Sequence, residues 1–80
     1  MKEYLESIKI AILERRAGFE KLYKSYPEYV IINDDMLALL KAEVNVYFYP
    51  DRWKVTRPTI MGMAICTSPR IVNIDDIEVY

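Results

Sequence analysis

Apolar side chains recur along the first 25 residues at the three- and four-residue spacings of a single helix face. Pro27 ends this pattern, because proline disfavours helical geometry in the residue before it, so we expect one helix over residues 2–25. Arg15 is the one polar residue in this stripe, where it must pair with an acid, reach solvent or set the register of a helix–helix interface. The stripe fits a heptad whose apolar core members are Leu5, Ile8, Ile12, Phe19, Leu22 and Tyr26.

A second, smaller apolar patch lies roughly opposite that stripe on the same expected helix. It consists of Ile10, Leu13 and Ala17. A helix with two apolar faces has two surfaces to bury, so Ile10, Leu13 and Arg15 are candidate partner-binding residues. Gly18 costs a helix up to ~1 kcal/mol relative to alanine, which is typical of a position in close packing contact.

Short β-rich runs and one further helix follow Pro27. Residues 28–33 predict a strand, and Asn33 with the two aspartates after it predicts the N-cap and first turn of a helix over 34–43. The alternation in residues 45–50 predicts a half-exposed strand. A proline-containing turn follows it, so residues 53–56 are expected to return as its hairpin partner.

The last third of the chain predicts the centre of the sheet and one edge. Residues 59–67 are apolar on both faces, which is typical of a central strand. A turn at Asp75 and Asp76 precedes a last strand over 77–80. The order of these expected helices and strands along the chain predicts an α+β fold. The fold has a long N-terminal helix, one β-α-β unit between residues 29 and 67, and a small mixed or antiparallel sheet of three to five strands.

The size and charge of the chain limit the classes of function. Its 80 residues allow one domain, over 1–80, with a thin stability margin. A content of 52% apolar and 12% aromatic residues excludes a disordered tail. The net charge of −1 and the pI of about 5.4 argue against a general nucleic-acid binder, which carries a basic excess.

Catalytic and metal-binding chemistry has few candidates in this sequence. There is no histidine, and Cys66, the only cysteine, lies inside an apolar run where a buried structural role is expected. The aspartate doublets at 34–35 and 75–76 are better explained as a helix cap and a turn than as ligands of a magnesium ion. We therefore expect no enzyme activity, no cofactor and no metal.

The segment over residues 47–54, together with Arg57, is rich in both aromatic and basic side chains. Three interpretations fit it: a protein–protein hot spot, a stacking surface for single-stranded nucleic acid, and a solvated hairpin whose Trp53 covers the core. The acidic pI favours the first over the second. The candidate partner-binding residues here are Tyr47, Tyr49, Arg52, Trp53 and Arg57.

Residues 27–67 place a proline before an apolar strand that ends in asparagine, then a helix with a leucine pair, then a threonine- and glycine-containing apolar run. The residues of this pattern are Pro27, Asn33, Leu37, Leu40, Thr59, Gly62 and Ile65. With this pattern the segment resembles part of the axial domain of phage major capsid proteins. Ala64 stands where that family usually has proline, and 80 residues leave no room for the spine helix and extended arm of a capsid subunit. The resemblance implies a phage or mobile-element setting and carries over no catalytic residue.

These observations favour a small non-enzymatic interaction protein. It would self-associate, or dock on and inhibit a larger host protein such as a defence or nucleic-acid-processing complex. The alternatives are a virion assembly accessory and a single-stranded nucleic-acid-binding module using Arg52, Trp53, Lys54 and Arg57. No run reaches the ~18–20 apolar residues of a membrane span, and the first residues lack a signal-peptide pattern, so we expect a cytoplasmic location in the host cell.

Overall fold

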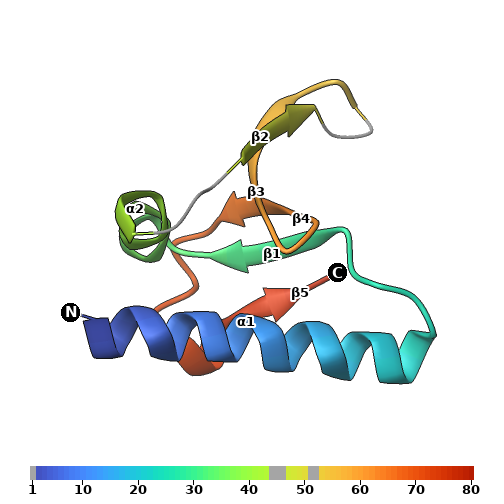
Figure 1. Cartoon of the computed structure of the whole chain (residues 1–80), viewed down its shortest axis with the longest axis horizontal. Coiled ribbons are helices and arrows are strands. Elements are labelled where there is room, and N and C mark those ends of the chain that lie inside the picture. Colours follow the sequence, from blue (N-terminus) through green and yellow to red (C-terminus); the bar gives the residue numbers. More distant parts are fainter. Residues whose placement is uncertain (1, 44–46, 51–52) are drawn as a thin grey trace.

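The computed structural model describes residues 2–43, 47–50 and 53–80, and it shows an α+β fold with two helices and a mixed sheet (Figure 1). The order of elements confirms the expected long N-terminal helix and the helix that follows the first strand. The elements are α1 (Lys2–Tyr23), β1 (Tyr29–Ile32), α2 (Asp34–Glu43), β2 (Tyr47–Pro50), β3 (Thr56–Ile60), β4 (Met63–Thr67), a 3-10 turn η1 (Ile74–Asp76) and β5 (Glu78–Val79).

The sheet has five strands in the order β2-β3-β4-β1-β5. Strands β1 and β4 are parallel, with Val30 opposite Ile65, and all other neighbours are antiparallel. The chain passes from β1 to β4 through α2 and β2–β3, which confirms the β-α-β unit expected between residues 29 and 67. Strands β2 and β5 are therefore the two edges of the sheet.

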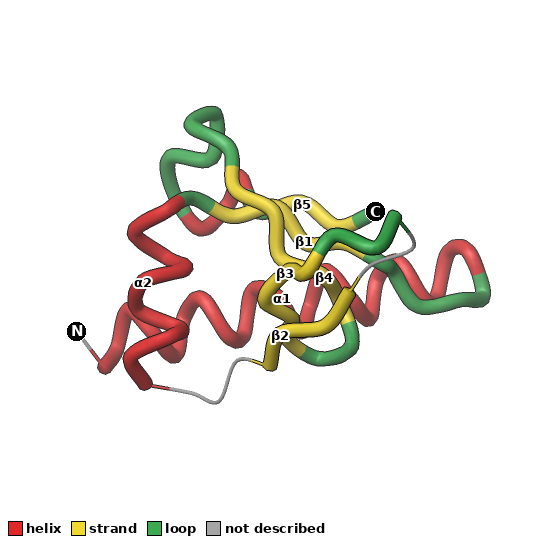
Figure 2. The backbone as a smooth tube through the Cα atoms, turned by 90° about the horizontal axis from the view of Figure 1, so that it is seen from above, coloured by secondary structure: helices red, strands yellow, loops and turns green. Residues whose placement is uncertain are grey.

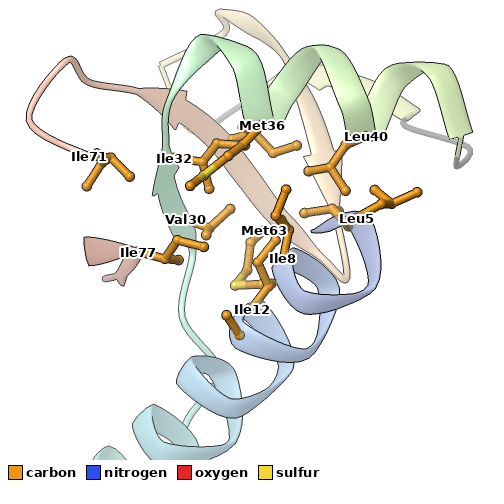
Figure 3. Close-up of a cluster of buried hydrophobic side chains, with 13 residues drawn as sticks. Leu5, Ile8, Ile12, Val30, Ile32, Met36, Leu40, Met63, Ile71 and Ile77 are labelled. Atoms are coloured by element: carbon orange, nitrogen blue, oxygen red, sulfur yellow. The ribbon is translucent and has the colours of Figure 1, made fainter. Parts of the chain in front are cut away.

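Both helices pack on the same face of the sheet. Burial alternates along β1, where Val30 and Ile32 are fully buried while Tyr29 and Ile31 are half-buried. Figure 3 shows the buried side chains of α1 and α2 gathered with those of the strands in one cluster. Its helix members are Leu5, Ile8, Ala11, Ile12, Met36 and Leu40, and its strand members are Val30, Ile32, Ile60, Met63 and Ile65, with Ile71 and Ile77 added from the segments before and after η1.

Helix α1 is longer than the sheet that it covers. Its 22 residues span about 33 Å, whereas strands of four or five residues span about 13–17 Å. Figures 1 and 2 show its last turns extending past the strands. The expectation that Leu22 and Tyr26 are core residues is therefore wrong: their side chains are 71% and 62% exposed.

Helix α1 also ends two residues earlier than expected. Lys24 adopts a left-handed conformation with a φ of 61°, and its N–H donates to the carbonyl oxygen of Glu20 at 2.8 Å. This is the usual geometry of a helix C-terminus, and it turns the chain back before the buried Pro27. Within the described residues, neither helix has the length and apolarity to cross a membrane.

The expected central strand over 59–67 is wrong, because it is a hairpin. Strands β3 and β4 are antiparallel, with Ile60 opposite Met63, and Met61 and Gly62 form the two-residue turn between them. Both turn residues have positive φ, 52° and 80°, as a type I′ turn requires. The hairpin partner expected over residues 53–56 is correspondingly wrong, because β3 pairs with β2.

Polar side chains cap the start of α2, as the sequence predicts, and also cap the 3-10 turn η1 at the expected turn of Asp75 and Asp76. The Oδ1 atom of Asn33 accepts the N–H of Met36 at 2.8 Å, while its Nδ2 atom donates to the carbonyl oxygen of Ile71 at 2.9 Å. Asn73 and Asp76 form a reciprocal capping box around η1. The carboxylate of Asp76 accepts hydrogen bonds from the backbone N–H groups of Asn73 and Val72. These bonds lower the pKa of Asp76 below its ordinary value.

Candidate functional site

The face of the sheet opposite the helices carries a row of polar and aromatic side chains. Tyr49 on β2 stands opposite Arg57 on β3, and an Nη atom of Arg57 donates to the Sγ atom of Cys66 on β4 at 3.7 Å. Cys66 is half-buried on this face, so the expectation that it is a buried core residue is wrong. The alternating side-chain directions of strands place it away from the helices.

The β2–β3 hairpin carries four exposed apolar side chains, on its two faces and in its connecting loop: Phe48, Tyr49, Trp53 and Val55, which we call the hairpin surface. Phe48 and Tyr49 are neighbours on β2 and therefore point to opposite faces of the sheet. Trp53 is 71% exposed, so the interpretation in which it covers the core is wrong. Figure 1 shows the hairpin at the far side of the molecule from α1. Its position at a sheet edge leaves it open to another molecule.

Two of the predicted partner-binding residues are described only in part or not at all. Tyr47 occupies the first position of β2, opposite Thr59, but its side chain lies outside the described residues. Arg52 lies outside them altogether. One hairpin carries the other three predicted residues of this segment, Tyr49, Trp53 and Arg57. On the same hairpin, the ring of Phe48 lies 5.7 Å from the Nζ atom of Lys41 on α2.

The predicted apolar patch on the first helix is on the molecular surface. Ile10 is 52% exposed and Leu13 is 49% exposed, and they lie on the side of α1 opposite its buried residues. This confirms a helix with two apolar faces, one of which remains open. The structure does not bring this patch together with the hairpin surface, which lies at the other edge of the sheet (Figure 1).

Arg15 contacts the backbone of η1 and of Ile77, just before the last strand, instead of forming one of the contacts expected from the sequence. Its Nε atom donates to the carbonyl oxygen of Ile77 at 3.0 Å, and an Nη atom donates to the carbonyl oxygen of Asp75 at 3.2 Å. The helix thus shields the outer edge of the sheet where β5 begins. A shielded edge is one way in which proteins prevent unwanted strand pairing.

An open groove runs between the last turns of α1 and β5, and we call it the edge groove. Its lining includes Gly18, Phe19 and Leu22 from the helix and Ile77, Val79 and Tyr80 from the strand side. The hydroxyl group of Tyr80 donates to the carboxylate of Glu78 at 2.5 Å. This hydrogen bond and the negative charge of Glu78 raise the pKa of Tyr80 above its ordinary value of 10.0.

The sequence analysis did not identify the edge groove as a site. One signal was present: the heptad stripe of α1 continues for two turns beyond what a short sheet can cover. The side chains of that extension, Phe19 and Leu22, form the helical wall of the groove. Gly18 also lies in this wall, and the close packing contact expected there is wrong: among the described residues, apart from its chain neighbours and the adjacent helix backbone, no atom lies within 4 Å of where a Cβ would be.

A second cleft lies where β1 and β4 end and α2 begins. Its lining includes Asn33, Asp34, Asp35 and Ser68. Anions that favour a helix N-terminus would be repelled here by two carboxylates. In the described part of the chain, no three His, Cys, Asp or Glu side chains are grouped to hold a metal ion. The expected absence of catalysis and of a metal stays a prediction.

Comparison with known proteins gives no relative from which a function could be transferred. No protein-family model, no curated protein and no solved structure matches this chain. The resemblance to the axial domain of phage capsid proteins therefore stays a prediction, and the function has to be argued from the surfaces described above.

Proposed function

We propose that this chain is a small protein-interaction module without catalytic activity, which docks on a larger protein through the hairpin surface. The observation that carries the proposal is the exposure of three aromatic side chains on one edge hairpin: Phe48 and Tyr49 on the two faces of β2, and Trp53 in the loop that follows it. Aromatic residues of this kind dominate the binding energy of protein interfaces. Each of these side chains is more than half exposed, so most of its apolar surface remains accessible to a partner.

Two further features of the hairpin support a protein partner. Strand β2 is an edge strand, so its outer side can accept a strand of another protein. Arg57 lies beside Tyr49 on the open face of the sheet, and arginine is the charged residue most enriched at interfaces. The acidic pI of the chain does not favour a nucleic acid as the partner.

The biological setting of this role stays a prediction. We propose a phage or mobile-element protein that acts in the cytoplasm of a host cell by binding and inhibiting a larger host protein. A stoichiometric inhibitor of this kind needs a docking surface and no active site. A virion assembly accessory would use the same surface and is the alternative within this class.

Affinity capture with matched variants tests the proposal. The purified chain is used to capture proteins from a host lysate, alongside the double variant Phe48→Ala/Trp53→Ala and the control Val72→Ala. Val72 is exposed like the hairpin residues but lies outside the hairpin, before η1. We expect one protein to be captured stoichiometrically by the wild type and by the control, and to be lost with the double variant. Capture that is insensitive to the double variant would contradict the proposal.

Single-stranded nucleic acid is the rival ligand for the same surface. Trp53 is the only tryptophan, so its fluorescence reports directly on contacts at the hairpin. Titration with single-stranded oligonucleotides at low salt is expected to leave this fluorescence unchanged. Saturable quenching that disappears as the salt concentration rises would replace the protein partner by a nucleic acid.

A further inference from the structure

The outer half of the β2–β3 hairpin extends beyond the rest of the sheet. Strands β2 and β3 pair as far out as Pro50 opposite Thr56, whereas the described pairing of β3 with β4 covers Thr59 and Ile60. Pro58 lies two positions before Ile60, so its backbone faces β4 but has no N–H group to continue that ladder. The part of the hairpin beyond Pro58 therefore projects from the sheet (Figure 1).

A basic residue accompanies each of the three exposed aromatic side chains of this hairpin. The pairs are Lys41 with Phe48, Arg57 with Tyr49, and Lys54 with Trp53. In the first pair the Nζ atom lies 5.7 Å from the ring. The second is a cross-strand pair, whose side chains share one face of the sheet. The third consists of neighbours in the segment that connects β2 to β3, and both side chains are exposed.

The hairpin is the basic part of an acidic chain. Residues 47–57 carry three basic side chains and one acidic side chain, a balance of +2. The rest of the chain carries eight basic and eleven acidic side chains, a balance of −3. Interfaces are arranged so that a positive patch meets a negative one. A surface that combines aromatic rings with positive charge is therefore complementary to carboxylates that border an apolar surface.

We infer that the projecting end of the hairpin binds an acidic cleft on the partner protein, with an apolar interior and carboxylates at its rim. The inference rests on the proposed function and adds the chemistry of the partner. Phe48 and Tyr49 lie on opposite faces of β2 and Trp53 follows in the loop, so a partner that contacts all three encloses the end of the hairpin. The basic side chains beside these rings then meet the rim of the cleft, where interfaces are polar.

The arrangement of rings and charges disfavours single-stranded nucleic acid as the occupant. Such a strand is held along a positively charged groove that follows its backbone, while its bases stack on aromatic side chains. The row that starts at Arg57 continues across the open face of the sheet through Cys66 and Ile31 to Glu78, and so ends on a carboxylate. The basic residues therefore surround the end of the hairpin and do not form a track along the sheet.

Titration with polymers of known charge tests the acidic character of the partner. The fluorescence of Trp53 is followed as poly-L-glutamate, poly-L-lysine or a thymidine oligonucleotide is added at low salt. The variant Lys54→Gln/Arg57→Gln removes two charges from the hairpin, and the control Lys21→Gln/Lys24→Gln removes two from the end of α1. Lys54 and Lys24 both have a left-handed φ, 64° and 61°, so the two variants are matched. We expect saturable, salt-sensitive binding of poly-L-glutamate alone, weakened about tenfold in the hairpin variant and unchanged in the control.

Single variants on the two faces of β2 test the enclosure of the hairpin. In the capture experiment described above, Phe48→Ala and Tyr49→Ala are each expected to weaken binding of the captured protein about tenfold or more, because a cleft contacts both faces. Capture that depends on one of the two rings and ignores the other would overturn the enclosing cleft.

Three results of the titration would overturn the acidic partner. They are the absence of poly-L-glutamate binding, equal weakening by the hairpin variant and its control, and tighter binding of the oligonucleotide than of poly-L-glutamate. Circular dichroism confirms that each variant is folded. Because Arg57 contacts Cys66, the single variant Lys54→Gln at an exposed position repeats the test without a change at β4, and a smaller loss of binding is expected. A protein that is captured by the wild type and lost with Phe48→Ala/Trp53→Ala supports the proposed function even where poly-L-glutamate does not bind, so the two failures are distinguishable.

Discussion

The Nε atom of Arg15 lies 3.0 Å from the carbonyl oxygen of Ile77, and this hydrogen bond ties the middle of α1 to the residue that leads into the last strand. The side chain of Ile77 is buried in the core, while its carbonyl points outward from the sheet edge. The arginine that interrupts the apolar stripe thus satisfies a backbone group that would otherwise be an open edge of the sheet. The bond joins two residues that are 62 positions apart in the sequence.

Replacement of Arg15 should reveal the strength of this contact. Arg15→Leu removes both carbonyl hydrogen bonds and should lower the free energy of unfolding by about 1–2 kcal/mol, less than a fully buried charged bond because the site is partly exposed. Arg15→Lys keeps one donor and should be intermediate. Urea unfolding at low protein concentration measures both. A leucine variant as stable as the wild type would show that the two bonds contribute nothing to stability, and Glu20→Ala serves as a control on the exposed side of α1.

The two glycines should respond in opposite directions to the same substitution. Gly62 has a φ of 80° in the β3–β4 turn, so Gly62→Ala is strained there and should destabilise the protein by about 1 kcal/mol or more. Gly18→Ala adds a methyl group in open space inside a helix and should stabilise it by about 0.5–1 kcal/mol. Urea unfolding of both variants decides this. Equal effects of the same sign would contradict the turn assignment.

The sequence predicts the elements better where a polar side chain marks an end than where only apolar residues occur. Asn33 identifies the start of α2 because the side chain of a cap must accept a backbone N–H. The run 59–67 contains no such mark. A two-residue turn with one glycine and one methionine looks like a continuous apolar strand, and the positive φ of Met61 is visible only in the structure.

The extent of the core could not be read from periodicity alone. The heptad stripe of α1, interrupted by Arg15, extends through Leu22. Burial nevertheless ends where the sheet ends, and the length of the sheet depends on strand pairing far away in the sequence. The hairpin residues Tyr49, Trp53 and Arg57 could be grouped from their proximity in the chain. The edge groove could not, because Tyr80 meets Leu22 only through the pairing of β5 with β1.

Asn33 has two contacts that separate substitutions can distinguish. Asn33→Ala removes the N-cap of α2 and the bond to the carbonyl of Ile71, so we expect a loss of about 2–3 kcal/mol in the free energy of unfolding. Asn33→Asp keeps the cap acceptor and loses only the donor, so it should lie between alanine and the wild type. Thermal and urea unfolding give the ranking. An aspartate variant as unstable as the alanine variant would show that the cap contributes little.

The Asp76 carboxylate should make the stability of the protein depend on pH in the acidic range. Backbone N–H groups of Asn73 and Val72 lower the pKa of Asp76 below its ordinary value of 3.8. The folded state therefore holds this proton less tightly than the unfolded chain, so the stabilisation is present above the unfolded pKa and is lost as the pH falls through the folded one. Asp76→Asn removes the titrating group. The difference in unfolding free energy between wild type and variant should be largest near neutral pH and should shrink below about pH 4.

Urea unfolding over this pH range measures that difference, with Asp76→Glu as the variant that keeps a carboxylate. A difference that stays constant with pH would show that the capping box around η1 does not depend on the charge of Asp76.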